Sequence, residues 1–311
     1  MVTLLFLAGL GLLYVGGEAL VRGATALGIR LRMTPMVIGL TIVAAATSAP
    51  ELAVSIGAVL NNAPGLAVGN VVGSNLCNLT LVVGLTVLVA PARLRDKLER
   101  ADVLFLTIST ILVPALLLDG ILERAEGISL VIGIVAYVGL TIWRTNARRE
   151  DTSSSVPAVS EHPLVNAAIG VVGIALLVIG SDWLVTASIT IATTLGVSTA
   201  VIGLSAAALG TSLPEIAASI IAARHRHPEM AVGNLIGSNI FNLLLILGAT
   251  ASVRPLTLGR VEFSDIGIMI ASSLFCLGLM MVRDQVKRID GMLLIAVYVV
   301  YLIWLFSTGR T

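Results

Sequence analysis

Two glutamates lie inside stretches of the chain that otherwise carry no charge. Glu51 ends the sequence Thr-Ser-Ala-Pro-Glu, and Glu215 ends Thr-Ser-Leu-Pro-Glu. A charged side chain at the centre of a bilayer costs at least about 2.5 kcal/mol, so it is expected to face a partner or a cavity. The surrounding apolar runs contain no lysine or arginine near these depths that could pair with the acids. The two glutamates are therefore predicted to bind a cation.

Further oxygen atoms accompany each glutamate. A threonine lies one helical turn before it and shares its face, a serine follows the threonine, and a proline directly precedes the acid. The proline removes a backbone donor and frees a carbonyl one turn back. Hydroxyl, carbonyl and carboxylate oxygens suit a hard cation such as Ca²⁺ or Na⁺. These residues are Thr47, Ser48 and Pro50 in the first copy and Thr211, Ser212 and Pro214 in the second.

A second block, Gly-Asn-x-x-Gly-Ser-Asn-x-x-Asn, occupies residues 69–78 and again 233–242. Its first and last asparagines and its serine recur every fourth residue and share one helical face. Ca²⁺ takes roughly six to eight oxygen ligands, which this face could complete, although hydrogen bonding between buried amides is the ordinary alternative. Asn75 and Asn239 are expected to point elsewhere and to be structural. The candidate ligands are Ser74, Asn78, Ser238 and Asn242.

Long apolar helices are needed to position these groups. The chain has 311 residues, of which 57% are hydrophobic and 12% are charged, about half the charge of a soluble domain. Solid apolar runs of about 20 residues predict membrane-spanning helices rather than strands. The fold class is therefore an all-α membrane protein with ten transmembrane helices. The ten runs are 3–28, 33–60, 67–90, 102–120, 124–144, 163–188, 198–223, 229–252, 262–282 and 289–308.

The two copies of the motifs lie 164 residues apart throughout. That offset spans five helices, an odd number, so the second copy is predicted to enter the membrane upside down. The first repeat is 1–145, with its motif at 37–82, and the second is 163–311, with its motif at 201–246. Fourteen basic residues fall on one side and four on the other, which makes the rich side cytoplasmic and both termini extracellular. Residues 146–162 form a charged, serine-rich cytoplasmic linker.

Several classes of function are disfavoured. The chain has no Cys/His cluster, phosphate loop or nucleophile–base pair, so it is not expected to be an enzyme or to hold a cofactor. A net charge of +1 gives no reason to expect nucleic acid as a partner. The expected partners are the lipid bilayer and transported ions, with no obligatory protein partner evident. The expected location is the inner or plasma membrane of a prokaryote, as a multi-pass protein.

Charges nearer the helix ends have simpler interpretations. Glu18 has Arg22 one turn later, which predicts a local ion pair near the membrane edge. The run Arg224-His-Arg-His227 is predicted to anchor the chain at the cytoplasmic interface, with a histidine pH sensor as the alternative. The first and sixth spans are long and poor in charge near their centres, and they are expected to slide against the rest as a gate.

The paired motifs Thr-Ser-x-Pro-Glu and Gly-x-x-x-Gly-Ser-Asn-x-x-Asn resemble the α-repeats of the cation/Ca²⁺ antiporter superfamily, most closely the ten-helix prokaryotic sodium/calcium exchangers. The resemblance covers the whole chain. It implies a Ca²⁺ site ligated by both glutamates, and Na⁺ sites that share these groups and add the carbonyls of Ala44 and Ala208. The implied set is Glu51, Glu215, Thr47, Ser48, Thr211, Ser212, Ser74, Asn78, Ser238, Asn242, Ala44 and Ala208.

Two positions depart from the family pattern. Ala46 stands where glycine is usual, and Asn242 stands where some relatives carry aspartate, so this site has two carboxylates. The predicted function is a secondary active antiporter that exchanges Na⁺ for Ca²⁺ by alternating access and normally extrudes Ca²⁺. The alternatives are a Ca²⁺/H⁺ antiporter of the same superfamily and, from another class, a passive cation channel.

Overall fold

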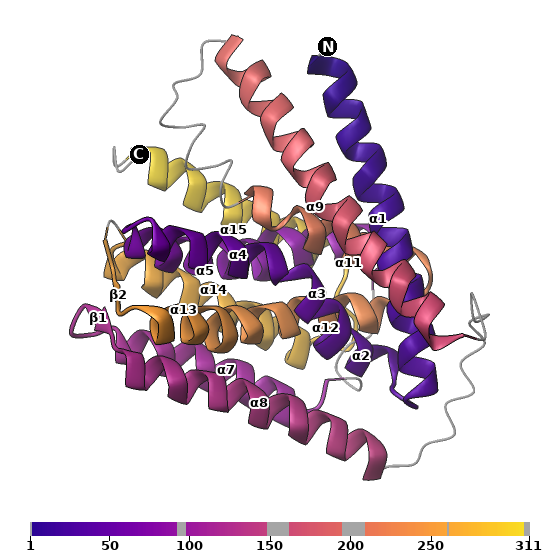
Figure 1. The fold of residues 1–311 in the computed structure, drawn as a ribbon, viewed down its shortest axis with the longest axis horizontal. Helices are drawn as coiled ribbons and strands as arrows, with labels where there is room; N and C mark the ends of the chain where they lie inside the picture. The colour runs from indigo at the N-terminus through magenta and orange to yellow at the C-terminus, as the bar shows by residue number, and fades with distance from the viewer. Residues whose placement is uncertain (1, 92–97, 148–161, 195–208, 260, 308–311) are drawn as a thin grey trace.

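The computed structural model describes residues 2–91, 98–147, 162–194, 209–259 and 261–307, and nearly all of them are helical (Figure 1). Within this part of the chain, eight helices are long and apolar enough to cross a membrane. A further predicted span forms α7 (Arg100–Leu116), which has 17 residues. The span at 198–223 is described only from residue 209, and α11 (Leu213–Arg224) forms its end. The protein is an all-helical membrane protein, and the count of ten spans stays a prediction.

The second span is interrupted at its middle by Ser48. Its pieces are α2 (Pro35–Ile38), the π-helical turn η1 (Gly39–Val43), α3 (Ala44–Thr47) and α4 (Ala49–Leu60). The break arises because Pro50 has no N–H for the carbonyl one turn back. The chain turns at Ser48, and α4 then begins two residues before Glu51. In the second half, Ser212 precedes α11 in the same way.

Two interrupted helices form the centre of the bundle. One consists of α5 (Pro64–Cys77), the π-helical turn η2 (Asn78–Val82) and α6 (Val83–Val89), and the other of α12 (Pro228–Ile240), η3 (Phe241–Ile246) and α13 (Leu247–Val253). In their apolar stretches 78% and 94% of the residues are buried, against 33% in the first span. Single π-helical turns often mark functional sites, and here they include the candidate residues Asn78 and Asn242.

Two glycines let α12 lie directly against the second span. A Cβ atom at Gly233 would lie 2.4 Å from the backbone oxygen of Met36, and one at Gly237 would lie 2.5 Å from that of Leu40. Such distances leave room only for glycine, so the two backbones touch. This contact brings the polar face of α12 next to Thr47.

The helices α1 (Val2–Arg30) and α9 (Pro163–Thr194) form an antiparallel pair that runs obliquely across the other helices (Figure 1). Gly9, Gly16 and Gly23 are seven residues apart and face α9. A Cβ atom at any of the three would lie between 2.7 and 2.9 Å from a backbone atom of α9. The pair is therefore joined along a seam of backbone contacts.

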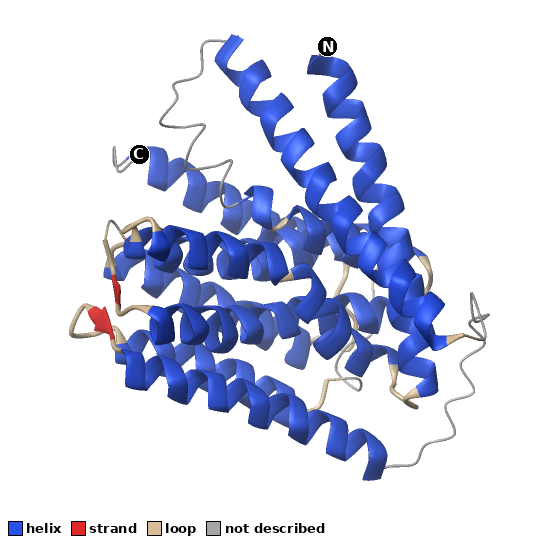
Figure 2. Cartoon of the chain, in the orientation of Figure 1, coloured by secondary structure: helices blue, strands red, loops and turns tan. Residues whose placement is uncertain are grey.

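The remaining helices are α8 (Arg124–Ala147), α14 (Phe263–Val282) and α15 (Arg288–Ser307). Each half uses a tyrosine to join its last two helices: Tyr137 donates to Asp102 at 3.3 Å, and Tyr301 donates to Asp265 at 3.5 Å. Two short strands that the sequence analysis did not predict, β1 (Ile121–Leu122) and β2 (Leu256–Thr257), pair antiparallel at one end of the bundle (Figure 2). They link a loop of each half.

Candidate cation site

Glu51 and Glu215 are fully buried, each in the first turn of the helix that follows the break. None of their four carboxylate oxygens has a hydrogen-bond partner among the described residues. The two side chains are close enough for their charges to interact. Buried polar atoms are nearly always paired in proteins, so four unpaired acceptors at one place indicate a group that binds there.

No buried base accompanies the two glutamates in the described part of the chain. The buried charged residues there are all acids, and the other three, Asp102, Asp265 and Asp290, belong to the outer helices. An ion pair with a lysine or arginine was the ordinary explanation for an acid in the membrane. Two adjacent carboxylates without such a partner repel each other, and a cation between them would remove that repulsion.

Thr47 links the first glutamate's helix to the second half. Its hydroxyl lies 3.2 Å from Asn234 Oδ1 and 3.4 Å from Ser238 Oγ, both on α12. An amide oxygen only accepts hydrogen bonds, so the threonine donates to Asn234 and keeps its lone pairs. Thr47 and Ser238 also lie beside the Glu215 carboxylate. The hydroxyl of Thr47, from the first half, therefore lies beside the carboxylate of Glu215, from the second half.

Thr211 of the second half makes the equivalent contacts with the first half. Thr211 Oγ1 lies 3.4 Å from Asn70 Oδ1 and 3.3 Å from Ser74 Oγ, both on α5. The Thr211 side chain lies beside Glu51. Each of these residues is 164 positions from its counterpart around Thr47. The candidate hydroxyls of the two halves are thus brought together crosswise, around both acids.

Ser48 and Ser212 lie at the helix breaks in nearly the same backbone conformation. Their φ and ψ angles are −81° and 0° for Ser48, and −85° and −1° for Ser212. Both hydroxyl oxygens are buried and have no hydrogen-bond partner among the described residues. Each serine lies three residues before its glutamate in the chain.

The predicted backbone ligands are the carbonyl oxygens of Ala44 and Ala208. The Ala44 oxygen accepts from the Ser48 N–H at 3.0 Å, and the Thr47 hydroxyl, which donates to Asn234, lies 3.4 Å away. A carbonyl oxygen has two lone pairs, so this one could accept a cation beside the Ser48 bond. Its counterpart, Ala208, lies outside the described residues.

Two serines that were not predicted from the sequence accept hydrogen bonds from the side-chain amides of Asn70 and Asn234. Ser55 Oγ accepts from Asn70 Nδ2 at 3.1 Å, and Ser219 Oγ accepts from Asn234 Nδ2 at 3.0 Å. Both serines are fully buried. Each lies four residues after its glutamate and therefore on the same face, which is the signal that could have identified it.

Asn78 and Asn242 differ from each other although they occupy equivalent positions. Asn242 Nδ2 donates to Asn75 Oδ1 at 3.0 Å, whereas neither amide atom of Asn78 has a partner among the described residues. The expectation that Asn75 points away from the candidate ligands is wrong, because it contacts one of them directly. The Oδ1 atoms of Asn78 and Asn242 are both buried and unpaired.

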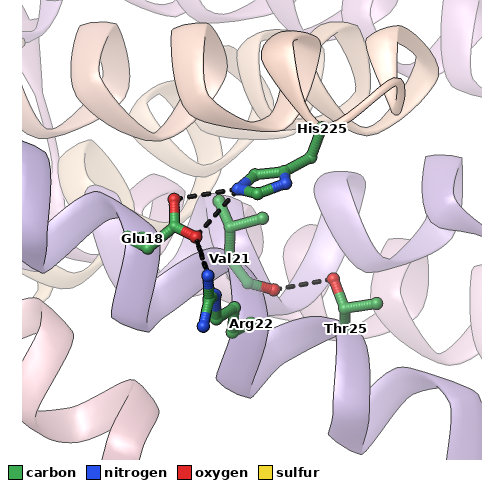
Figure 3. A network of polar contacts seen from close by, with 5 residues as sticks. All are labelled: Glu18, Val21, Arg22, Thr25 and His225. Carbon is green, nitrogen blue, oxygen red and sulfur yellow. Dashed lines mark hydrogen bonds and ion pairs between the residues drawn. The ribbon is translucent and has the colours of Figure 1, made fainter. Parts of the chain in front are cut away.

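Glu18 shows what an acid with partners looks like in this fold. It forms the predicted ion pair with Arg22, at 2.6 Å, and also contacts His225 Nε2 at 2.8 Å (Figure 3). His225 follows α11, so this contact ties α1 to the helix that carries Glu215. Glu18 is thus paired with two basic side chains, whereas neither central glutamate has a basic partner among the described residues.

Comparison with known proteins places this geometry in a family. The sequence model of the sodium/calcium exchanger protein family matches residues 1–143 and 165–307. The inner membrane protein YrbG of Escherichia coli is 32% identical over 98% of this chain and 96% of its own length. The sodium/calcium exchanger MaX1 of Methanosarcina acetivorans is 31% identical over 97% of this chain and 98% of its own length.

The fold agrees with a solved structure of that family. The sodium-calcium exchanger NCX_Mj, soaked with zero Na⁺ and Ca²⁺, superposes with a TM-score of 0.84 at 28% identity, over 97% of this chain and 98% of that one. Buried acids surrounded by hydroxyl and amide oxygens from two related halves suit the cations that such a protein carries. The chain belongs to the sodium/calcium exchanger protein family and is a multi-pass cation/Ca²⁺ antiporter.

Proposed function

We propose that this antiporter exchanges Na⁺ for Ca²⁺ and that it normally moves Ca²⁺ out of the cell. The observation that carries the proposal is the group of four unpaired carboxylate oxygens on Glu51 and Glu215. Two carboxylates neutralise one Ca²⁺, and the surrounding hydroxyl and amide oxygens supply further neutral ligands. Their number and hardness suit Ca²⁺ and Na⁺.

The proposed ligands are those predicted from the sequence. In support, Thr47 and Thr211 lie beside the acids, the hydroxyl oxygens of Ser48 and Ser212 are unpaired, Ser74 and Ser238 bond to the threonines, and Asn78 and Asn242 present unpaired oxygens. The carbonyls of Ala44 and Ala208 complete the proposed set for Na⁺. Because both ions need the same two glutamates, they cannot bind together.

Exchange follows from these shared ligands. Without a cation, the two buried glutamates would keep their negative charges in low-dielectric surroundings while the protein changes from one open state to the other. The free-energy cost of these uncompensated charges disfavours that change. A bound ion removes that cost, so the protein changes state mainly when occupied. The sodium gradient of the cell would then drive Ca²⁺ outward.

The proposed architecture has ten spans in two inverted repeats, residues 1–145 and 163–311, joined by a cytoplasmic linker at 146–162. The α-repeat motifs are 37–82 and 201–246, and both termini are extracellular. The crosswise contacts of Thr47 and Thr211 support equivalent roles for the two motifs. The family match to two separate stretches supports the division of the chain.

The second candidate is Ca²⁺/H⁺ exchange. The same observation favours it, since two adjacent buried carboxylates could share a proton when no metal is bound. The two candidates differ in the ion that replaces Ca²⁺ on the glutamates.

The test is uptake of radiolabelled Ca²⁺ into proteoliposomes loaded with Na⁺, with external Na⁺, K⁺ and pH varied one at a time. Uptake that requires internal Na⁺ and falls as external Na⁺ rises supports the proposal. Uptake that ignores the Na⁺ gradient and follows the pH gradient replaces it with proton exchange. Flux that needs no counter-ion would indicate a passive channel.

A further inference from the structure

Four buried asparagines lie together where α5 and α12 run into their π-helical turns. Asn75 and Asn78 come from the first half, and Asn239 and Asn242 stand at the equivalent positions of the second. All four are at most 1% exposed. Identical residues at equivalent positions would be expected to make equivalent hydrogen bonds.

They do not. Asn75 reaches across to the other half, where its Nδ2 donates to the backbone oxygen of Asn239 at 3.5 Å and its Oδ1 accepts from Asn242 Nδ2 at 3.0 Å. Asn239 turns back on its own helix and donates to the Leu235 oxygen at 2.7 Å. Its Oδ1 has no partner among the described residues, and neither has either amide atom of Asn78.

The asparagines nearer the starts of α5 and α12 share a symmetric set of bonds. One turn earlier in α5 and α12, Asn70 and Asn234 each donate to a serine of their own half and accept from a threonine of the other. Those bonds obey the two-fold relation between the halves. The four neighbouring amides therefore break a two-fold relation that these bonds of Asn70 and Asn234 keep.

The crossing amide fixes the orientation of Asn242. A backbone oxygen only accepts, so the Asn75 group that faces it must be Nδ2, and Oδ1 then faces Asn242. Asn242 must answer with its own Nδ2, which leaves its Oδ1 free to bind a cation. Nothing among the described residues orients Asn78 in this way.

We propose that Asn75 and Asn239 are alternating positioning residues, each of which orients the candidate ligand of the opposite half in one of the two transport states. In the state seen here, Asn75 crosses and orients Asn242. In the opposite state, Asn239 crosses and orients Asn78, while Asn75 turns back to the Val71 oxygen. The inference rests on the proposed function, because inverted repeats that exchange their conformations convert one open state into the other.

The unpaired atoms match the missing bonds of that second state. The bond equivalent to Asn242–Asn75 would join Asn78 Nδ2 to Asn239 Oδ1, and both of these atoms are buried and unpaired here. Releasing the Asn239 amide from Leu235 would free its donor for the backbone oxygen of Asn75. Each state thus satisfies one pair and leaves the other unsatisfied, which makes the cluster a two-state element.

The test compares Asn75→Ala, Asn239→Ala and the double variant in oriented proteoliposomes. The measurement is the half-saturating Ca²⁺ concentration on each membrane face, expressed as a ratio. Losing one crossing bond should depopulate one state, and the apparent affinity at the face to which that state opens falls with its population. We expect the single variants to shift the ratio about fivefold in opposite directions, the effect of one buried hydrogen bond. The double variant should return it near the wild-type value.

A second readout needs no transport. Hydrogen exchange in detergent, followed by mass spectrometry, compares the backbone amides just after Pro64 and Pro228, which are equivalent positions at the starts of α5 and α12. The single variants should change the ratio of these rates in opposite directions. Shifts in the same direction, or no shift in either variant, would overturn the inference.

Glu51→Gln, assayed in parallel, separates this inference from the function on which it rests. If Glu51→Gln abolishes Ca²⁺ exchange while the asparagine variants shift the ratio alike, only the positioning role fails. If Glu51→Gln leaves exchange intact, the proposed site fails, whatever the asparagines do.

Discussion

The α1–α9 pair and the centre of the bundle both depend on close glycine contacts, and the centre adds hydrogen bonds between side chains of the two halves. The seam of the pair consists of glycines at seven-residue intervals that press backbone against backbone. The centre is crossed by directional bonds such as Thr47–Asn234 and Thr211–Asn70. A glycine seam packs by van der Waals contact, whereas the centre cannot move without exchanging hydrogen bonds. From this difference we expect the centre to bind the ion and the pair to move as one body.

The acids give the largest expected difference between the two regions. Glu51→Gln removes one of two unpaired buried carboxylates, while Glu18→Gln removes an acid of α1 that is paired with Arg22 and His225. We expect Glu51→Gln to lower Ca²⁺ exchange more than about a hundredfold, because a buried cation would lose half of its compensating charge. Glu18→Gln should change exchange less than about threefold, since partly exposed ion pairs contribute little.

The measurement is Na⁺-dependent Ca²⁺ uptake, normalised to the amount of folded protein in the vesicles. Glu215→Gln serves as the matched variant in the second half and should be as severe as Glu51→Gln. Equal losses in Glu18→Gln and Glu51→Gln would contradict the division between the two regions.

Cross-links test whether the pair moves as one body. A Cβ atom at Gly17 would lie 2.5 Å from Ile221 Cδ1 on α11, so cysteines at these positions can be bridged by a short bifunctional thiol reagent. A Cβ atom at Gly180 would lie 2.9 Å from Leu12 Cβ and 2.9 Å from the Leu13 nitrogen, so cysteines at 12 and 180 can bridge α1 to α9 once the seam widens, and the uncross-linked double variant is the reference. The native Cys77 and Cys276 are buried and can stay in place.

We expect the bridge from α1 to α11 to lower exchange at least about tenfold, because it prevents a domain-scale shift of the pair. The bridge within the pair should leave exchange near the level of the uncross-linked protein. Cleavage by a reductant, with a disulfide-containing reagent, should restore transport in the first case. If the internal bridge stops transport and the external one does not, the pair does not move as one body.

The sequence correctly predicted those features that depend on residue spacing within a single helix. The 164-residue offset and the helical period identified the buried acids and the polar faces that surround them, and the four-residue spacing identified the Glu18–Arg22 pair. It failed where the partner comes from another helix. The contact of His225 with Glu18 joins residues 207 positions apart, and no local pattern encodes it.

The prediction for Asn75 failed for the same reason. Asn75 lies in the regular helix α5, before the π-helical turn that begins at Asn78, but the residue that it contacts, Asn242, comes from the other half. The crosswise pairing of Thr47 with Asn234 likewise depends on the close approach that Gly233 and Gly237 permit. Such approach distances are properties of the packed bundle rather than of one segment.

The smallest expected effect concerns the serines that hold the centre's amides. Ser219→Ala removes the acceptor of Asn234, and the freed amide no longer orients the Thr47 hydroxyl beside Glu215. We expect the half-saturating Ca²⁺ concentration to rise about threefold to tenfold with little change in maximal rate, as for a residue that supports a ligand without touching the ion. Ser273→Ala is the matched control, because that buried serine donates within its own helix α14, to the Met269 backbone oxygen. Ser55→Ala should have a weaker effect of the same kind, because Asn70 Nδ2 also donates to the Glu51 backbone oxygen at 3.3 Å and keeps that bond; a larger effect in Ser55→Ala than in Ser219→Ala would mean that the halves bind the cation unequally.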